Sequence, residues 1–307
     1  MLINNSFELI GNTPLLKLNN LLQFIDYQDN EFYVKCEMYN LTGSIKDRAA
    51  LTMINEALKQ NKINTDGTII EATSGNTGIG LAAIASIYKL KCIIVMPDSM
   101  SIERIKLMEL YGAEVVLTKG AEGMSGAIAK AIEINKKTPN SLIISQFDNP
   151  HNPLAHYNKT ADEIYDDLYG DINYLFAGIG TGGTISGIAQ KLKPQIPNLK
   201  VIGIEPKDSP IITKGYKGPH KIQGIGAGFI PANLNQNLID DYITVTNDDA
   251  YKYAHLLTAT EAILGGISSG AALAGAINYA QKHQLKNQKI VIILPDSGMR
   301  YLSDERF

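Results

Sequence analysis

The chain has 307 residues and a mass of 33.4 kDa, a size that suggests two domains. Its net charge of −3 leaves no electrostatic footprint for nucleic acid or for an anionic membrane surface. No apolar run reaches the ~20 residues of a membrane helix, the N-terminus lacks the features of a secretory signal, and two cysteines cannot form a disulfide framework. We therefore expect a cytoplasmic protein that binds neither nucleic acid nor membrane.

Short apolar runs alternate with helical stretches, which predicts an α/β fold with largely parallel sheets. Two Asn-Pro pairs interrupt this pattern at 148–153. We expect a smaller, mobile domain at 40–150 and a larger one formed by 1–39 with 151–307. The predicted strands are 32–38, 68–72, 92–96, 114–117, 141–146, 174–178, 201–204 and 290–294. The predicted helices are 44–60, 77–89, 101–111, 123–136, 152–168, 184–192, 248–264 and 268–282.

Lys46 lies at the start of the predicted helix 44–60, with Ser44 as the expected N-cap and Asp47 three residues later. The positive end of the helix dipole disfavours a protonated ammonium group at this position. A neutral amine is a nucleophile for aldehydes, so Lys46 is a candidate for Schiff-base chemistry. The alternative is an ordinary solvated lysine at a helix start.

The polar turn 71–78 connects a predicted strand to an apolar helix and contains Gly75 and Gly78. Unpaired backbone N–H groups at such a helix start bind carboxylate or phosphate. A plain helix cap made by Ser74 or Asn76 is an equal alternative on this segment alone.

The glycine-rich turn 178–184 matches the pattern G-x-G-x-x-G, and Glu205 follows at the end of the next predicted strand. This arrangement is typical of nicotinamide or flavin oxidoreductases. The other interpretation is a nest of backbone N–H groups around one phosphate, to which the hydroxyls of Thr181 and Thr184 add.

The segment 266–270 matches the G-x-S-x-G pattern of serine hydrolases. The preceding residues have helical rather than strand periodicity, and the only later histidine, His283, lies along the same predicted helix as Ser268. Because that pattern requires a strand, a turn and a helix, a serine hydrolase is disfavoured. The five histidines lack ligand spacing, so we expect no metal site.

Together these turns suggest one ligand, an aldehyde cofactor with a phosphate group that acts on a substrate with a carboxylate. Pyridoxal 5′-phosphate (PLP) needs a Schiff-base lysine, a phosphate cradle, a partner for its pyridine nitrogen and a group that holds its phenolic oxygen. Lys46, the turn 180–184, Ser268 and Asn76 can supply these in that order.

Over essentially its whole length the chain resembles the cysteine synthase (O-acetylserine sulfhydrylase) family and the related catalytic core of cystathionine β-synthase. The resemblance implies a fold-type II PLP enzyme, like the tryptophan synthase β subunit, with two open, twisted, mostly parallel sheets flanked by helices. The segments that carry it, in the family's order, are 8–15, 43–48, 73–78, 96–104, 146–147, 180–184, 224–231 and 266–271.

The resemblance also implies roles for the matching residues. Lys46 holds the cofactor as a Schiff base and, once displaced by substrate, is the base that removes the Cα proton. Asn76 bonds the ring oxygen, and Ser268 faces the pyridine nitrogen, with Ser269 as the less favoured choice. The phosphate-binding residues that it implies are Gly180, Thr181, Gly182, Gly183 and Thr184. The residues implied for the substrate α-carboxylate are Thr73, Ser74, Gly75, Thr77 and Gln146.

The implied reaction is a β-replacement by a transferase that converts O-acetyl-L-serine and sulfide to L-cysteine and acetate through an α-aminoacrylate. A hydroxyl opposite the ring nitrogen does not stabilise a protonated ring, which favours β-elimination over transamination. The alternative is L-cysteine or L-serine as the donor, giving lanthionine, cystathionine or hydrogen sulfide. The segment 224–231 looks like the sulfhydrylases, whereas 152–164 looks more like cystathionine β-synthase.

The resemblance further implies a homodimer and, as a possible partner, the tail of serine acetyltransferase docked in the active-site cleft. A weakly catalytic homologue that serves only as such a partner is a third hypothesis. The presence of Lys46, Asn76 and Ser268 argues against this loss of catalysis.

Overall fold

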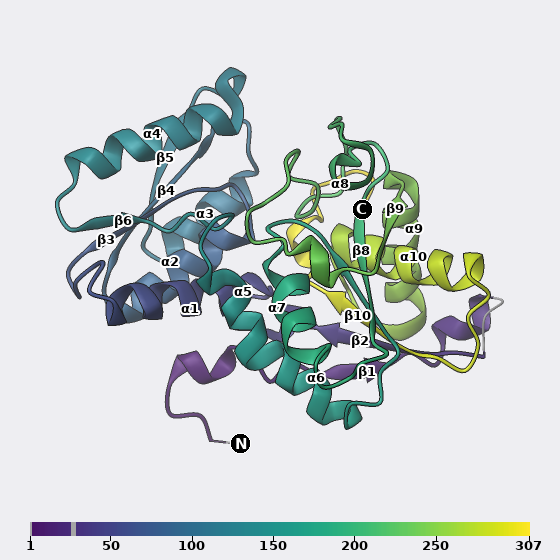
Figure 1. Cartoon of the computed structure of the whole chain (residues 1–307). Helices are drawn as coiled ribbons and strands as arrows, with labels where there is room; N and C mark the ends of the chain where they lie inside the picture. Colours follow the sequence, from purple (N-terminus) through teal and green to yellow (C-terminus); the bar gives the residue numbers. More distant parts are fainter. Residues whose placement is uncertain (1, 26–28) are drawn as a thin grey trace. The chain divides into compact units, whose positions relative to one another are not determined.

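The computed structural model describes residues 2–25 and 29–307 (Figure 1). These residues form two compact units. The first contains the described part of Met1–Ile10 together with Lys46–Asn152, and the second contains the described part of Gly11–Ile45 together with Pro153–Phe307. The chain therefore passes between the units three times, after Ile10, Ile45 and Asn152.

The first unit is built on a parallel four-stranded sheet with the order β5-β4-β3-β6. Helix α4 packs against this sheet through Ala127 and Ala131, which contact Ile70 and Val95. Helix α2 is apolar and buried along most of its length, and it packs against α1. The strands are β3 (Thr68–Ala72), β4 (Lys91–Pro97), β5 (Glu114–Thr118) and β6 (Ser141–Ile143). The helices are α1 (Lys46–Lys59), α2 (Asn76–Tyr88), α3 (Ile102–Leu110) and α4 (Gly123–Lys137), with 3-10 turns at Ser6–Leu9 and Gly120–Glu122.

The second unit contains a six-stranded sheet with the order β1-β2-β10-β7-β8-β9, in which only β1 is antiparallel to its neighbour. Helix α10 is buried over nearly its whole length between α9 and the sheet. The strands are β1 (Leu15–Lys17), β2 (Glu31–Cys36), β7 (Tyr174–Gly178), β8 (Lys200–Pro206), β9 (Asp241–Val245) and β10 (Lys289–Leu294). The helices are α6 (Ala161–Leu168), α7 (Gly183–Leu192), α8 (Ile211–Lys214), α9 (Asn247–Glu261) and α10 (Ile267–Lys282), with 3-10 turns at Leu21–Phe24, Glu37–Tyr39, Gln236–Leu238 and Gly298–Arg300.

The two mostly parallel sheets confirm the predicted α/β class, and the predicted elements agree with the observed ones apart from a few ends. The predicted helix 152–168 is a continuous segment made of α5 (His151–Ala155), a π-helical turn (His156–Thr160) and α6. The predicted strand 141–146 ends early, at Ile143, because Ser145 has a φ of +57° that no strand residue adopts. The short strands β1 and β9 and the four-residue helix α8 were not predicted. β1 and α8 have only three and four residues, too few for a clear period.

Among the described helices, none is both long and apolar enough to cross a membrane.

Candidate active site

Lys46 is the first residue of α1, and the segment before it is held by the backbone of the second unit. Ser44 pairs with Asp296 in an isolated antiparallel bridge, and the Ile45 N–H donates to the Pro295 carbonyl (2.8 Å). Backbone pairing with residues 295–296 therefore holds the chain where it enters α1. That Ser44 is the N-cap of this helix stays a prediction.

A buried polar network ties the opening motif 8–15 to the segment that leads to Lys46. The Thr13 hydroxyl donates to Glu37 Oε1 (2.7 Å), and the Asn40 side-chain amide donates to Glu37 Oε2 (2.8 Å). Asn40 in turn accepts the Gly11 N–H (2.8 Å), while the buried Lys35 ammonium donates to the Thr13 carbonyl (2.6 Å). The expected site residues included neither Lys35 nor Glu37. The sequence signal that could have identified them is a charged residue within a buried strand or in the turn directly after it.

The turn expected to bind the substrate carboxylate is the short loop between β3 and α2. The Gly75 N–H donates to Thr73 Oγ1 (3.3 Å), and no atom lies within 4 Å of where a Gly75 side chain would begin. The Thr77 hydroxyl donates to Gln146 Oε1 (2.6 Å), a contact across 69 residues of sequence. The fold thus brings Gln146 to this turn, and Asn76 is the first residue of the same helix.

The turn expected to bind phosphate runs from the end of β7 at Gly178 to the start of α7 at Gly183. A Cβ on Gly180 would lie 2.2 Å from the Gly224 carbonyl oxygen, so a side chain there would require the backbone to move. Gly182 has a φ of +79°, and a Cβ there would lie 2.8 Å from the Leu234 backbone. Glycines therefore allow this turn to pack closely against the backbone at Gly224 and Leu234 where α7 begins. A helix start after such a turn is the kind of segment that binds phosphate.

Two residues with hydroxyl groups, Thr184 and Ser268, lie in or near the turn that is expected to bind phosphate. The Thr184 hydroxyl lies 3.3 Å from Nε2 of the buried His156, whose Nδ1 is 3.0 Å from the Thr160 hydroxyl. Ser268, buried at the start of α10, has its Oγ 3.7 Å from where a Gly224 side chain would begin. Gly224 is the residue against which Gly180 packs, so the structure brings Ser268 close to the phosphate-binding turn.

The hydroxyl of Ser269 donates to the Asp296 carbonyl (3.3 Å) and so serves the protein backbone. This supports Ser268 rather than Ser269 as the residue opposite the pyridine nitrogen. Each unit thus carries residues that fit PLP: a glycine-rich turn before a helix and a buried serine in the second, and a lysine at a helix start in the first. The roles of the individual residues stay predictions.

The oxidoreductase interpretation of the turn 178–184 required a carboxylate that can bind a ribose. Glu205 instead caps α8, because its carboxylate accepts the N–H groups of Ile212 (3.0 Å) and Thr213 (3.1 Å). The serine hydrolase interpretation also fails, since α9 rather than a strand precedes Gly266, and His283 stacks on Tyr279 at the end of α10.

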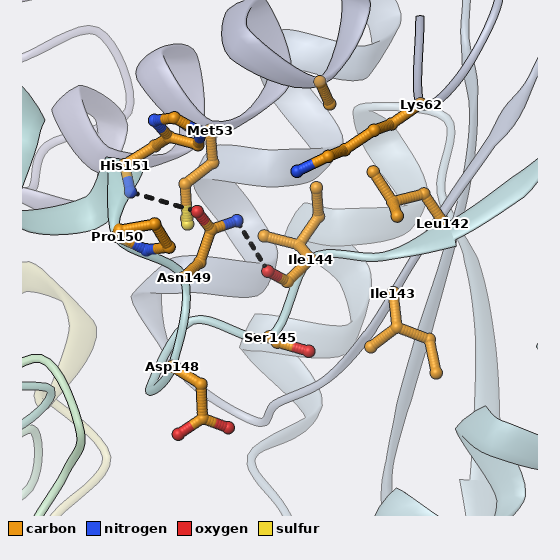
Figure 2. Close-up of a pocket in the computed structure, with 11 residues that line it drawn as sticks. Met53, Lys62, Leu142, Ile143, Ile144, Ser145, Asp148, Asn149, Pro150 and His151 are labelled. Atoms are coloured by element: carbon orange, nitrogen blue, oxygen red, sulfur yellow. Dashed lines mark hydrogen bonds between the residues drawn. The ribbon is translucent and has the colours of Figure 1, made fainter. Parts of the chain in front are cut away.

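A pocket of about 200 Å³ lies in the first unit beside α1 and β6 (Figure 2). None of its lining residues is expected to bind cofactor, although Ser145 directly precedes Gln146. Within residues 2–25 and 29–307, no group of three His, Cys, Asp or Glu side chains is placed to hold a metal ion. The residues that line the pocket are Met53, Ala57, Lys62, Leu142, Ile143, Ile144, Ser145, Asp148, Asn149, Pro150 and His151.

Comparison with known proteins identifies the family. The model of the pyridoxal-phosphate dependent enzymes matches residues 7–296. A cysteine synthase from Flavobacterium is 53% identical over 83% of this chain and 81% of its own length, and cysteine synthase B from Campylobacter jejuni is 48% identical over 98% and 97%. The crystal structure of a hydrogen sulfide-producing enzyme from Fusobacterium nucleatum superposes with a TM-score of 0.92 at 48% identity, covering 98% of this chain and 100% of that one. The chain belongs to the pyridoxal-phosphate dependent enzymes and, within them, to the cysteine synthase family.

Proposed function

We propose that the chain is a PLP-dependent transferase that replaces the β-substituent of an amino acid, converting O-acetyl-L-serine and sulfide to L-cysteine and acetate. The relatives named cysteine synthase, at 48–53% identity, support this reaction. The structural observation that carries it is the hydrogen bond between Thr77 and Gln146. This hydrogen bond joins the two segments that are expected to hold the carboxylate of the donor amino acid. The residues expected to bind that carboxylate include no cationic side chain.

Each expected residue has a defined task in this proposal. When bound, PLP supplies an electron sink for the negative charge that develops at the donor Cα. The Lys46 amine holds the cofactor and then accepts the Cα proton, and the Ser268 hydroxyl hydrogen-bonds the ring nitrogen. The Asn76 amide orients the ring oxygen. The residues that bind the phosphate are Gly180, Thr181, Gly182, Gly183 and Thr184. Those that bind the donor carboxylate are Thr73, Ser74, Gly75, Thr77 and Gln146.

The serine at position 268 directs this chemistry towards the β-carbon. A hydroxyl does not hold a proton on the ring nitrogen as a carboxylate does, so charge spreads less far into the ring. Loss of the Cα proton is then best coupled to departure of the β-substituent. Acetate is an easier leaving group than hydroxide, which favours O-acetyl-L-serine over L-serine as the donor.

A second candidate reaction is release of sulfide from L-cysteine, with water or a second thiol as the acceptor. It removes the same Cα proton and differs in the leaving group and in the acceptor. The observation that favours it is the similarity to the hydrogen sulfide-producing enzyme of Fusobacterium nucleatum over nearly the whole of both chains. The homodimer and the contact with serine acetyltransferase remain predictions from the family, and the cytoplasmic location remains a prediction from the sequence.

A comparison of donors tests the proposal. Purified enzyme is given O-acetyl-L-serine with sulfide, L-cysteine alone, L-cysteine with homocysteine, and L-serine with homocysteine, and the products are identified by mass spectrometry. We expect L-cysteine from the first mixture at the highest kcat/KM. Faster formation of lanthionine and sulfide from L-cysteine alone would establish the second candidate instead. No product from any mixture, with PLP bound, would contradict both.

A further inference from the structure

Glu71 is a buried carboxylate that the proposed reaction does not use. It lies in β3, a strand that is otherwise apolar apart from Thr68, and it is 3% exposed. Two residues further along the chain, at Thr73, the turn expected to bind the donor carboxylate begins. A buried carboxylate is costly unless hydrogen bonds compensate for its lost hydration, so its partners indicate what it does.

The partners of Glu71 are all in the turn that carries Gln146. One carboxylate oxygen accepts the Ser145 N–H (2.8 Å), and the other accepts the Gln146 N–H (3.2 Å). The Gln146 side chain also interacts with Glu71 and lowers the pKa of that carboxyl group. Glu71 therefore holds the backbone of Gln146 and interacts with its side-chain amide.

Hydrogen bonds hold this turn. On one side it borders the pocket of about 200 Å³, to which Ser145, Asp148 and Asn149 contribute (Figure 2). Figure 2 shows Asn149 bracing the turn, with its amide donating to the Ile144 carbonyl (2.8 Å) and its oxygen accepting the His151 N–H (3.0 Å). Ser145 itself has a left-handed backbone, with φ at +57°. Such a conformation persists where surrounding contacts hold it, and Glu71 supplies one of these contacts.

The ionised carboxylate also determines which way the Gln146 amide points. A carboxylate only accepts hydrogen bonds, so the Gln146 NH₂ group must face Glu71 and the amide oxygen must face away. The Thr77 hydroxyl donates to that oxygen (2.6 Å), in agreement with this orientation. An amide nitrogen has two N–H bonds, so Gln146 can serve Glu71 and a substrate carboxylate at the same time.

We propose that Glu71 is a positioning residue for donor binding, which in its ionised form aims the Gln146 N–H at the α-carboxylate of the amino-acid donor. This inference rests on the proposed function, because it assumes that Gln146 binds that carboxylate. It assigns to Glu71 an effect on donor affinity through Gln146, with no contact between Glu71 and the reacting atoms.

The inference predicts a pH dependence. Burial raises the pKa of Glu71 to about 7, against the lowering effect of the hydrogen bonds from Gln146 and Ser145 and with a further raising effect from the charge of Asp148. The thiol of Cys92 on the neighbouring strand β4 also interacts with Glu71, but burial raises its pKa to about 12 and it stays neutral. Helix α2 and strand β6 contain no charged residue, and on α4 the side chains of Lys130 and Glu133 pair with each other at the surface. Below pH 7 the protonated Glu71 carboxyl group presents an O–H to N–H groups that need an acceptor. The affinity of the enzyme for the amino-acid substrate should therefore fall as the pH is lowered.

The test compares Glu71→Gln with wild type in the PLP-loaded enzyme at saturating sulfide. The new NH₂ group must face the N–H of either Ser145 or Gln146, and a mismatch of this kind corresponds to about a 10- to 100-fold rise in the KM for O-acetyl-L-serine. We expect kcat and the KM for sulfide to change by less than about threefold, because carboxylate binding is uniform between ground state and transition state. The wild-type rise in donor KM below pH 7 should be absent from Glu71→Gln. Glu71→Asp, which keeps the charge, should restore part of the affinity and the pH dependence.

Glu205→Gln is the matched control. Glu205 is also a buried carboxylate near the end of a strand and also accepts two backbone N–H groups, but it caps α8. A general loss of stability should appear in both variants, whereas the rise in donor KM should be confined to Glu71→Gln.

Gln146→Ala separates the two possible failures. If it leaves donor KM unchanged, Gln146 does not bind the donor, and the inference fails together with that part of the proposed function. If Gln146→Ala raises donor KM while Glu71→Gln leaves it unchanged at every pH, the inference alone is overturned. A fall in kcat of Glu71→Gln without a change in donor KM would also overturn it.

Discussion

Lys46 carries the chemistry of the proposed reaction, and its residue type and neighbouring residues make it recognisable in the amino-acid sequence. The fold adds that the chain enters α1 through backbone contacts of Ser44 and Ile45 with residues 295–296. Those contacts place Lys46 at the first position of α1.

Replacement of Lys46 by alanine should abolish most turnover while leaving cofactor binding through the turn 180–184 in place. General-base assistance alone contributes roughly 10²–10⁴-fold, so kcat should fall at least that far. Borohydride should fix a phosphopyridoxyl group on Lys46 of wild type, detected by peptide mass spectrometry. Lys62→Ala, at an exposed lysine three residues after α1, is the control and should keep both labelling and activity. Near-normal kcat in Lys46→Ala would show that another group removes the proton.

At the scale of elements, close approach of α9 and α10 determines the position of Ser268. Gly270 makes this approach possible, since a Cβ there would lie 2.0 Å from the Ala250 carbonyl oxygen and 2.6 Å from the Ala254 nitrogen. Gly275, further along α10, has side-chain atoms of Ile204 and Ile243 as its nearest neighbours. The same helix thus has one glycine against backbone and one against side chains that can shift.

This difference predicts unequal costs for the same substitution. Gly270→Ala must displace backbone, so overpacking should lower the free energy of unfolding by about 1–3 kcal/mol or more. Gly275→Ala gains about 1 kcal/mol of helix propensity, and the Ile204 side chain that the new methyl group meets can shift. The free energy of unfolding should therefore change by less than about 1 kcal/mol. Urea denaturation of the two PLP-loaded variants measures both values. Equal stability of the two variants would contradict the role given to Gly270.

At the scale of the molecule, the residues expected to bind PLP are divided between two compact units, with Lys46 and Asn76 in the first and the turn 180–184 and Ser268 in the second. That the smaller domain, expected at 40–150, moves as a body when the donor binds remains a prediction. Small-angle scattering with and without a donor amino acid can test it.

Removal of PLP should lower the melting temperature of the whole chain. A ligand that binds only the native state adds about 2.7 kcal/mol at a concentration one hundred times its Kd. Calorimetry of the resolved enzyme, before and after PLP is restored, measures the shift. Visible cofactor absorbance reports reconstitution. An unchanged melting temperature with no visible absorbance would show that PLP does not bind.

The sequence by itself determined the order of the elements, the parallel sheets and the loops expected to carry the chemistry, because hydrophobic period and glycine-rich turns are local properties of the chain. It did not show that Glu71 holds the turn of Gln146 or that Gly180 packs on Gly224. These features join residues far apart in the sequence, and a hydrogen bond or a close backbone contact between them exists only after the chain has folded. The distinction between Ser268 and Ser269 is of the same kind, since adjacent serines look alike in sequence and only the tertiary structure gives Ser269 the Asp296 carbonyl as its partner.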